Sequence, residues 1–269
     1  MTFKKQLVLG YGLLLCLTLP VVTYGLSCHL QWVCLYALLV VLISAALSLV
    51  MLREVNRRQR QFNTDVAHEL RTPLTSLRGT LEALLDGVWE PTPERLASCH
   101  EEIGRLTKLV EDLSLLTNIE WEYIKLNKTD FDLADLLKET ASRFQAAALQ
   151  KGLALELDVQ SQAIRADYDR LGQVFSNILS NAIKYTDAGS VTIRNAGKEV
   201  FVADTGMGIP PDALPHIFER FYRSDGSRAR STGGSGIGLT IAAALVKAHG
   251  GAIHAESETG KGSVFRVRF

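Results

Sequence analysis

The chain has 269 residues, and its 29 Lys and Arg balance its 29 Asp and Glu to a formal net charge of +0. This length predicts one or two domains, and the even charge gives no general reason to expect a nucleic-acid partner. The four cysteines form neither a Cys-x-x-Cys metal motif nor a disulfide framework, which favours a role as small apolar fillers. They are Cys16, Cys28, Cys34 and Cys99.

Two apolar segments open the chain, at residues 7–26 and 33–52. Each is about twenty residues long, which is the length that an α-helix needs to cross a hydrocarbon core of about 30 Å. We therefore predict two transmembrane helices within residues 1–52. A cleaved signal peptide is the alternative for the first segment, but its apolar stretch is long for such a signal and a second span follows.

The charges around these segments predict how they cross the membrane. Lys4 and Lys5 precede the first segment, and four arginines at positions 53, 57, 58 and 60 follow the second. The six residues between the segments include no Lys or Arg. By the positive-inside rule, both termini lie in the cytoplasm and the chain crosses the cell membrane's lipid bilayer twice. The outer loop is too short to fold into a ligand-binding domain.

A polar box at residues 62–73 reads Phe-Asn-Thr-Asp-Val-Ala-His-Glu-Leu-Arg-Thr-Pro. From Leu70 on, apolar residues recur at spacings of 4, 3, 4, 3 and 4 up to Val88, which predicts a helix with a heptad stripe. At 100° per residue, His68 lies about 160° from that stripe and faces solvent. Glu69 can accept the Nδ1 proton of His68, which makes Nε2 more nucleophilic, and Thr72 shares the same helix face.

A second helix is predicted after the break at residues 91–93, with Thr92 as N-cap and Pro93 in the first turn. Two antiparallel helices cannot bury a two-sided apolar stripe alone, so we expect a homodimer in which two hairpins form a four-helix bundle. This helical-hairpin dimerisation domain covers residues 53–120. The apolar positions of the second helix are Leu96, Cys99, Ile103, Leu106, Val110 and Leu113.

From residue 125 the pattern changes to alternating strands and helices. Helices are predicted at 133–150, 169–185 and from Gly236, and strands at 153–159, 191–194, 200–203, 252–256 and 263–269. The fold class is therefore α+β multidomain: two transmembrane helices, a helical hairpin, and an α/β sandwich with a mixed sheet over residues 125–269.

Three further motifs lie in this α/β region. One helix face carries Asn177, Asn181 and Lys184, and Tyr185 follows directly. Two amides and an ammonium on one face suit the binding of a hydrated cation and of phosphates. Taken alone, an asparagine pair that simply faces solvent is the ordinary explanation. Asp204 stands at a strand end, where its carboxylate can accept the exocyclic amine of adenine. Gly206 and Gly208 follow it and allow the backbone to approach the base.

Residues 233–238 read Gly-Gly-Ser-Gly-Ile-Gly and lead into a helix, so their amides favour phosphate. No Gly-Lys-Ser/Thr follows, which excludes a P-loop, and no strand directly precedes, which excludes a dinucleotide fingerprint. The aromatic segment at residues 218–223 precedes a Gly/Ser/Arg-rich stretch that reads as a lid over the nucleotide.

The order of these four motifs resembles the sensor histidine kinases over residues 60–269. Residues 62–73 are similar to their phosphoacceptor box, and the other three motifs resemble their catalytic domain within the ATPase group of gyrase, MutL and the related heat-shock chaperone. The resemblance implies an ATP-dependent protein-histidine kinase that autophosphorylates His68 and passes the phosphoryl group to an Asp of a response regulator. It also implies that the protein dephosphorylates that regulator, and that ATP and Mg²⁺ are its cofactors.

Carried over residue by residue, the resemblance assigns roles within both domains. Glu69 assists autophosphorylation, and Thr72 orients water for dephosphorylation. Asn181 ligates Mg²⁺ with Asn177 beside it, and Asp204 binds adenine. The residues near the phosphates and the nucleotide are Lys184, Arg223 and Tyr185. The glycines that shape the pocket and lid are Gly206, Gly208, Gly234, Gly236 and Gly238.

The chain departs from the usual layout of that family in two ways: no large sensor domain separates the spans, and the gap from Leu52 to His68 is too short for a relay bundle. The second span is therefore expected to continue as one helix into the acceptor helix. This resembles the intramembrane-sensing kinases, which often read a membrane partner protein. Two other functions stay open: a membrane-bound ATPase or chaperone that transfers nothing to itself, and a degenerate kinase that acts only as a phosphatase or scaffold.

Overall fold

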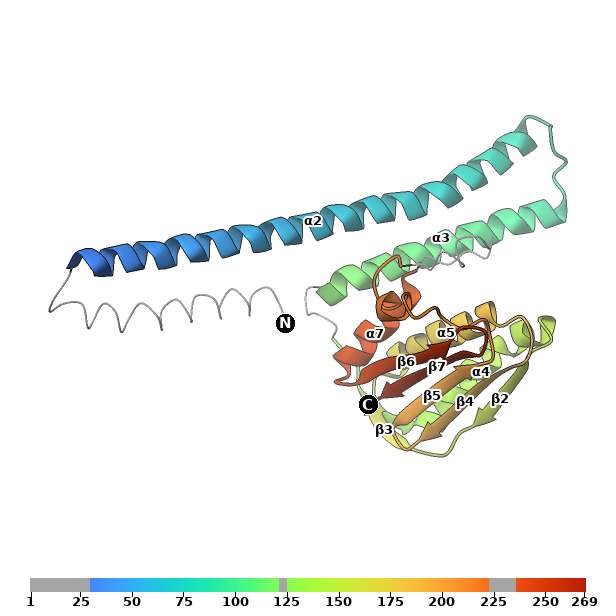
Figure 1. The fold of residues 1–269 in the computed structure, drawn as a ribbon. Coiled ribbons are helices and arrows are strands. Elements are labelled where there is room, and N and C mark those ends of the chain that lie inside the picture. The colour runs from blue at the N-terminus through green and yellow to red at the C-terminus, as the bar shows by residue number, and fades with distance from the viewer. Residues whose placement is uncertain (1–29, 121–124, 223–235) are drawn as a thin grey trace. The chain divides into compact units, whose positions relative to one another are not determined.

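The computed structural model describes residues 30–120, 125–222 and 236–269 of the chain (Figure 1). The first predicted membrane segment, residues 7–26, lies outside this described part. The chain divides into two compact units, Met1–Thr72 and Pro73–Phe269. The unit boundary therefore falls inside the box that carries His68.

Helix α2, Leu30–Leu85, is one continuous helix of 56 residues with Pro73 inside it. It joins the second apolar segment to the His68 box, which confirms the prediction that this segment continues as one helix into the acceptor helix. Its N-terminal half exposes large apolar side chains, such as Leu47 at 62% and Val50 at 63%. Within the described residues, α2 is the one helix that is long and apolar enough to cross a membrane.

Helix α3, Pro93–Glu120, begins where the sequence predicts it. The Thr92 hydroxyl accepts a hydrogen bond from the Arg95 amide at 3.4 Å, as expected of an N-cap. Part of each apolar stripe of the hairpin stays exposed in the single chain, with Val88 71% and Ile103 49% exposed, although Cys99 is buried at 8%. Removing such side chains from water is favourable, so these stripes favour association with a second copy.

The α/β domain contains one five-stranded mixed sheet in the order β2-β4-β5-β7-β6. The β2–β4 pair is parallel and the other three pairs are antiparallel, so the predicted mixed sheet is confirmed. The strands are β2 (Ala154–Asp158), β4 (Ser190–Ala196), β5 (Glu199–Asp204), β6 (Ala252–Glu258) and β7 (Gly262–Arg268). The helices are α4 (Leu133–Gln150), α5 (Tyr168–Tyr185), the short 3₁₀ helix η1 (Leu214–His216) and α7 (Gly238–Ala248).

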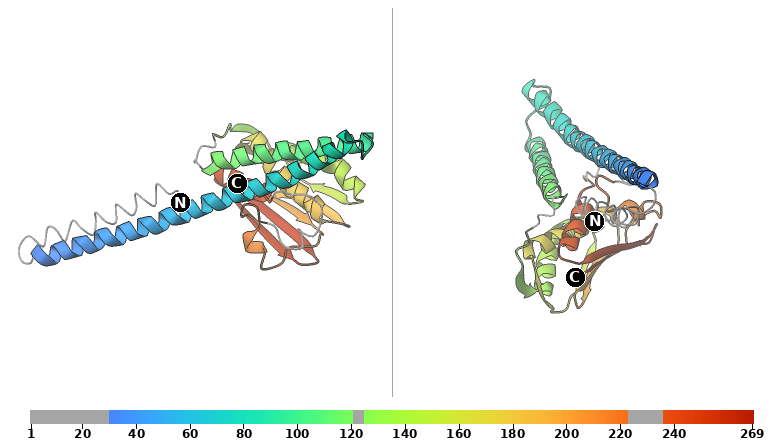
Figure 2. Two further views of the ribbon diagram at one scale, coloured as in Figure 1. Left: turned by 90° about the horizontal axis from the view of Figure 1, so that it is seen from above. Right: turned by 90° about the vertical axis from the view of Figure 1, so that its left-hand side faces the viewer.

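Helices α4, α5 and α7 cover one face of this sheet, and Figure 2 shows the same two layers from other directions. On α5, buried apolar residues recur every three or four positions, because one side of the helix faces the sheet. The result is an apolar core in which α5 packs between its neighbours. Its largest fully buried members include Leu136, Phe175, Ile178, Ile193, Ile241 and Leu245.

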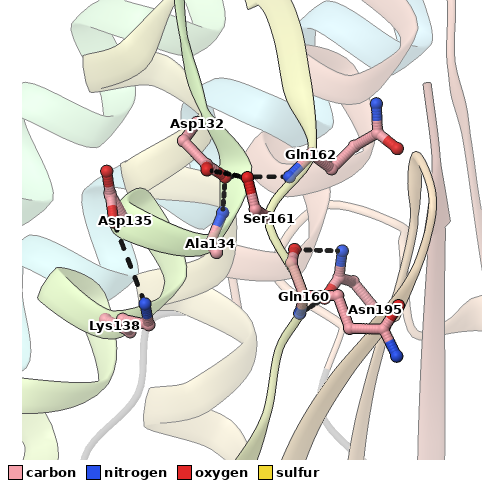
Figure 3. Close-up of polar contacts among 8 residues, drawn as sticks. All are labelled: Asp132, Ala134, Asp135, Lys138, Gln160, Ser161, Gln162 and Asn195. Carbon is pink, nitrogen blue, oxygen red and sulfur yellow. Dashed lines mark hydrogen bonds and ion pairs between the residues drawn. The ribbon is translucent and has the colours of Figure 1, made fainter.

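A second, two-stranded sheet was not predicted from the sequence. Strand β1, Thr129–Asp132, pairs antiparallel with β3, Ala163–Ala166, and each has only four residues. At the end of β1, the Asp132 carboxylate caps α4 by accepting from the Ala134 amide at 2.8 Å and from the Gln162 amide at 2.9 Å (Figure 3). This small sheet therefore fixes where α4 begins.

Candidate functional site

The asparagine motif lies on α5, which Asp167 caps by accepting from the Arg170 amide at 3.1 Å. Asn177 is buried, with 7% of its surface exposed, and its Nδ2 donates to the Gly238 carbonyl at 3.0 Å. Gly238 is the first residue of α7 and the last residue of the glycine-rich motif. The structure thus brings together Asn177 and Gly238, which are 61 residues apart in the chain.

Asn181 lies one turn further along α5, half-buried, and its side chain makes no hydrogen bond to another described residue. Lys184 follows on the same face, with Nζ 4.9 Å from the centre of the Tyr185 ring. The described residues include no group of three His, Cys, Asp or Glu that could hold a metal ion. An amide oxygen without a partner among the described residues suits Mg²⁺ that keeps most of its waters and binds substrate phosphates, so the residues fit that ion.

The Asp204 motif packs directly against the end of α5. The Met207 amide donates to the Tyr185 carbonyl at 3.2 Å. A Cβ on Gly206 would lie 2.5 Å from that same carbonyl oxygen, so only glycine fits there. Gly208 has φ +68, and its Cβ would lie 2.1 Å from the Glu258 carbonyl oxygen. Both glycines are therefore needed for close backbone contact.

Asp204 is half-buried at the end of β5, and its Oδ1 accepts from the Gly206 amide at 2.9 Å. Burial raises the pKa of this carboxyl above its ordinary value, and hydrogen bonds from Gly206 and Ser263 offset part of that effect. Ser263 stands opposite Asp204 in the β5–β7 register. The sequence analysis missed Ser263, because only the strand register identifies it as a neighbour of the carboxylate.

The two ends of the predicted lid meet at its base. The Phe221 amide donates to the Gly236 carbonyl at 3.1 Å. Phe221 has φ +56 and is the one non-glycine residue with positive φ among the described residues. Gly236 has φ +68, and a Cβ there would lie 2.9 Å from the Phe221 Cα. Arg223 and Gly234, which were also predicted, lie outside the described residues.

The predicted phosphoacceptor box lies on α2. His68 is exposed, as its angle from the apolar stripe predicts, and Glu69 is half-buried. The Thr72 hydroxyl donates to the His68 carbonyl at 3.3 Å, so both residues lie on one face of the helix. Pro73 has no amide proton to donate to the Glu69 carbonyl. An exposed imidazole has the access that a nucleophile needs.

The comparisons with known proteins match both parts of the chain. Residues 58–121 match the His Kinase A (phospho-acceptor) domain, and residues 166–269 match the histidine kinase-, DNA gyrase B- and HSP90-like ATPase. The signal transduction histidine-protein kinase BaeS of Escherichia coli is 42% identical over 208 residues, which are 75% of this chain and 44% of BaeS. The sensor histidine kinase RppB of Synechocystis is 37% identical over 234 residues, which are 83% of this chain and 52% of RppB. The chain thus spans about half the length of these relatives or less.

A solved structure, that of the Acinetobacter baumannii histidine kinase AdeS, is similar with a TM-score of 0.64 at 29% identity. The match covers 75% of this chain and 96% of the AdeS chain. The two matched domains stand in the same order as the motifs, with His68 in the first and Asn177 to Gly238 in the second. The chain therefore belongs to the sensor histidine kinases of two-component signalling.

Proposed function

We propose that this protein is a membrane sensor histidine kinase that phosphorylates its own His68 from ATP and passes the phosphoryl group to an Asp of a response regulator. The observation that carries the proposal is the convergence of three motifs on α5. Asn177 contacts Gly238, and Tyr185 contacts the loop of Gly206 and Met207. The structure of ShkA, similar with a TM-score of 0.57 at 30% identity, was solved in complex with AMPPNP, which supports a triphosphate as the ligand.

Each residue of this cluster has a chemical part in binding the substrate. Asp204 accepts the exocyclic amine of adenine, and Tyr185 lies near the nucleotide. Lys184 and Arg223 neutralise the phosphates, and Asn181 holds Mg²⁺ with Asn177 beside it. The glycines at 206, 208, 234, 236 and 238 allow the backbone to approach the ligand. Mg²⁺, when bound, supplies additional charge neutralisation at the phosphates.

In the proposed reaction, His68 Nε2 attacks the γ-phosphorus of ATP. A P–N bond forms, the bond from the γ-phosphorus to the bridging oxygen breaks, and ADP leaves. Glu69 accepts a hydrogen bond from Nδ1–H, which stabilises the positive charge that develops on the ring, and then takes that proton as the neutral phosphoramidate forms. The phosphoramidate then donates its phosphoryl group to the carboxylate of the regulator, which frees His68.

To test this function, the full chain is incubated in membrane vesicles with γ-labelled ATP and Mg²⁺. We expect phosphate on the chain that acid removes and base does not, as a phosphoramidate requires, and its transfer to an added receiver domain. ATP hydrolysis without labelled chain would instead identify a membrane-bound ATPase. Regulator dephosphorylation without labelling would identify a phosphatase-only protein.

Dephosphorylation of the regulator is proposed to depend on Thr72. Its hydroxyl makes a long bond to the His68 carbonyl, at 3.3 Å, and can turn from it to orient a water molecule. We expect Thr72→Ala to keep labelling by ATP and to slow dephosphorylation of the regulator on the order of tenfold. Thr80→Ala is the matched control, since Thr80 makes the same type of bond to Ser76 at 3.1 Å on the same helix. An unchanged dephosphorylation rate in Thr72→Ala would reject this role.

We propose the following organisation: two transmembrane helices within residues 1–52, a dimerisation and phosphotransfer domain at 53–120, and the ATP-binding domain at 125–269. Both termini lie in the cytoplasm, and a membrane partner protein is a proposed source of the signal. The partly exposed stripes on α2 and α3 favour a homodimer through a four-helix bundle. If cross-linking in vesicles traps only monomer, the dimer is wrong.

The two-span topology has a direct test in a native residue. Cys28 stands in the short segment between the two apolar runs, which the topology puts outside the cell. We expect a membrane-impermeant thiol reagent to label intact cells at Cys28, and this labelling to disappear in Cys28→Ser. If the reagent reaches Cys28 only after the cells are opened, the topology is wrong.

A further inference from the structure

The C-terminal end of α5 lacks the usual backbone cap. A helix leaves its last four carbonyls without intrahelical donors, and a glycine in the left-handed conformation commonly lets the following amides satisfy them. In α5 the C-cap is Thr186, whose backbone is extended at φ −103 and ψ 120. Donors for the last carbonyls must therefore come from elsewhere.

Two of the four donors come from the nearby chain. The Thr186 hydroxyl donates to the Ala182 carbonyl at 2.7 Å. The Met207 amide, from the Asp204 loop, donates to the Tyr185 carbonyl at 3.2 Å. The two carbonyls between them still need partners.

Lys151 supplies both of these partners. Its Nζ donates to the Ile183 carbonyl at 2.8 Å and to the Lys184 carbonyl at 2.9 Å. A third bond from Nζ reaches the Thr186 carbonyl at 3.2 Å. An ammonium has three N–H donors, so all of them are used on the end of one helix. A positive charge at a helix C-terminus is also favoured by the helix dipole.

The backbone of Lys151 is fixed independently of these bonds. Lys151 is the C-cap of α4, and its amide donates to the carbonyls of Ala147 and Ala148 at 3.3 and 3.1 Å. Gly152 follows with φ +69 and donates its amide to the Leu149 carbonyl at 2.9 Å. The lysine side chain therefore extends from a rigid point to the end of α5.

We propose that Lys151 is a positioning residue for the nucleotide site: its ammonium holds the last turn of α5 in the conformation that binds ATP. This inference rests on the proposed function, in which Lys184 and Tyr185 of that turn face the nucleotide. The same turn also supports the Asp204 loop, because a Cβ on Gly206 would already touch the Tyr185 carbonyl. If the last turn frays at Ile183 and Lys184, both the end of the asparagine motif and the Asp204 loop are therefore displaced.

The predicted loss is one of ATP affinity, because the bonds of the Lys151 ammonium to the described residues all go to backbone carbonyls and not to the reacting groups. Without the ammonium, the carbonyls of Ile183 and Lys184 lose their donors, and Ile183 is 5% exposed, which limits replacement by water. The last turn then populates conformations that do not bind nucleotide. Such an effect raises the KM for ATP and leaves the maximal rate of phosphorylation nearly unchanged.

The test measures the autophosphorylation rate of the full chain in membrane vesicles as a function of ATP concentration. We expect Lys151→Met, which keeps the aliphatic stem, to raise the KM about tenfold, equal to about 1.4 kcal/mol, with a maximal rate within about twofold of wild type. Lys151→Arg retains charge and donors and should restore the KM to within about threefold. If Lys151→Met does not accumulate, Lys151→Gln, with neutral donors, should raise the KM about threefold.

The matched control is Lys138→Met on α4. Lys138 pairs only loosely with Asp135, its Nζ 3.9 Å from Oδ1, and its loss should leave the KM at the wild-type value (Figure 3). A wild-type KM in Lys151→Met overturns the inference, and so does an equal loss of maximal rate in the Met and Arg variants. If the wild-type chain itself takes no label from ATP, the proposed function fails instead, so the two failures are distinguishable.

Discussion

We expect His68→Ala to lose labelling by γ-labelled ATP completely, a decrease of at least about a hundredfold, while nucleotide binding stays at the wild-type level. The reason is a division of tasks between two parts of the chain. His68 is exposed on α2, whereas the residues proposed to bind the nucleotide gather around α5. The measurement combines labelling in vesicles with direct titration of a fluorescent ATP analogue.

His100→Ala is the matched control for this prediction. His100 is also an exposed histidine on a helix of the predicted phosphotransfer domain, on α3, but no Glu-x-x-Thr-Pro follows it. It should keep full labelling. Labelled phosphate that persists in His68→Ala, or disappears in His100→Ala, would assign the acceptor to another residue. Loss of nucleotide binding in His68→Ala would show that the two parts do not act separately.

Much of the fold could be predicted from the sequence, because periodicity and caps are local. Helix α4 spans the predicted residues 133–150, and α5 starts one residue before its predicted start at 169. The Thr92-Pro93 start signal located α3 in the same way. In each case the apolar positions are three or four residues apart, which only a helix places on one face.

The parts that could not be predicted depend on contacts between distant segments. Strands β1 and β3 have four residues each, which is too few to show a clear alternating pattern. Their positions depend instead on their pairing with each other and on the Asp132 cap of α4. The positive φ of Phe221 has no sequence signal, because glycine is the residue expected in that conformation. It occurs where the Phe221 amide donates to the Gly236 carbonyl, a contact between residues distant in the sequence.

The same distinction between local patterns and long-range contacts applies to the candidate site. The spacing of Asn177, Asn181 and Lys184 already puts them on one face of a helix. That Asn177 donates to Gly238, or that Ser263 lies opposite Asp204, depends on how α7 and β7 pack and pair. A motif in the sequence thus predicts the kind of ligand, and only the fold shows which residues support each side chain.

The second large effect is expected from Asp204→Asn, which should weaken ATP binding by about tenfold to a hundredfold. The proposed bond from the adenine amine to Asp204 involves an ionised acceptor, and such bonds contribute about 1.5–3 kcal/mol. An amide is a weaker acceptor and presents N–H groups of its own to the base. Asp158→Asn, at an exposed carboxylate in β2, is the control and should bind ATP like wild type.

The same substitution should not destabilise the ligand-free protein. Burial raises the pKa of Asp204, so the folded chain binds its proton more tightly than the unfolded chain does. The contribution of this group to stability therefore decreases as the pH rises from the ordinary pKa of an Asp through the raised value. Above the raised pKa, the buried carboxylate is charged and its destabilising effect is fully present. Asn carries no charge, so Asp204→Asn should be at least as stable as wild type at neutral pH.

Binding measurements at lower pH distinguish the loss of the Asp204 contact with adenine from a general structural defect of the variant. Wild-type ATP affinity should decrease as Asp204 takes up a proton, at a higher pH than an exposed Asp would require, and this dependence should be absent from Asp204→Asn. Titration of the ATP phosphates affects both proteins alike, so the difference between the two curves isolates Asp204. A variant that unfolds more easily at neutral pH and binds ATP as tightly as wild type would contradict both the buried charge and its proposed contact with adenine.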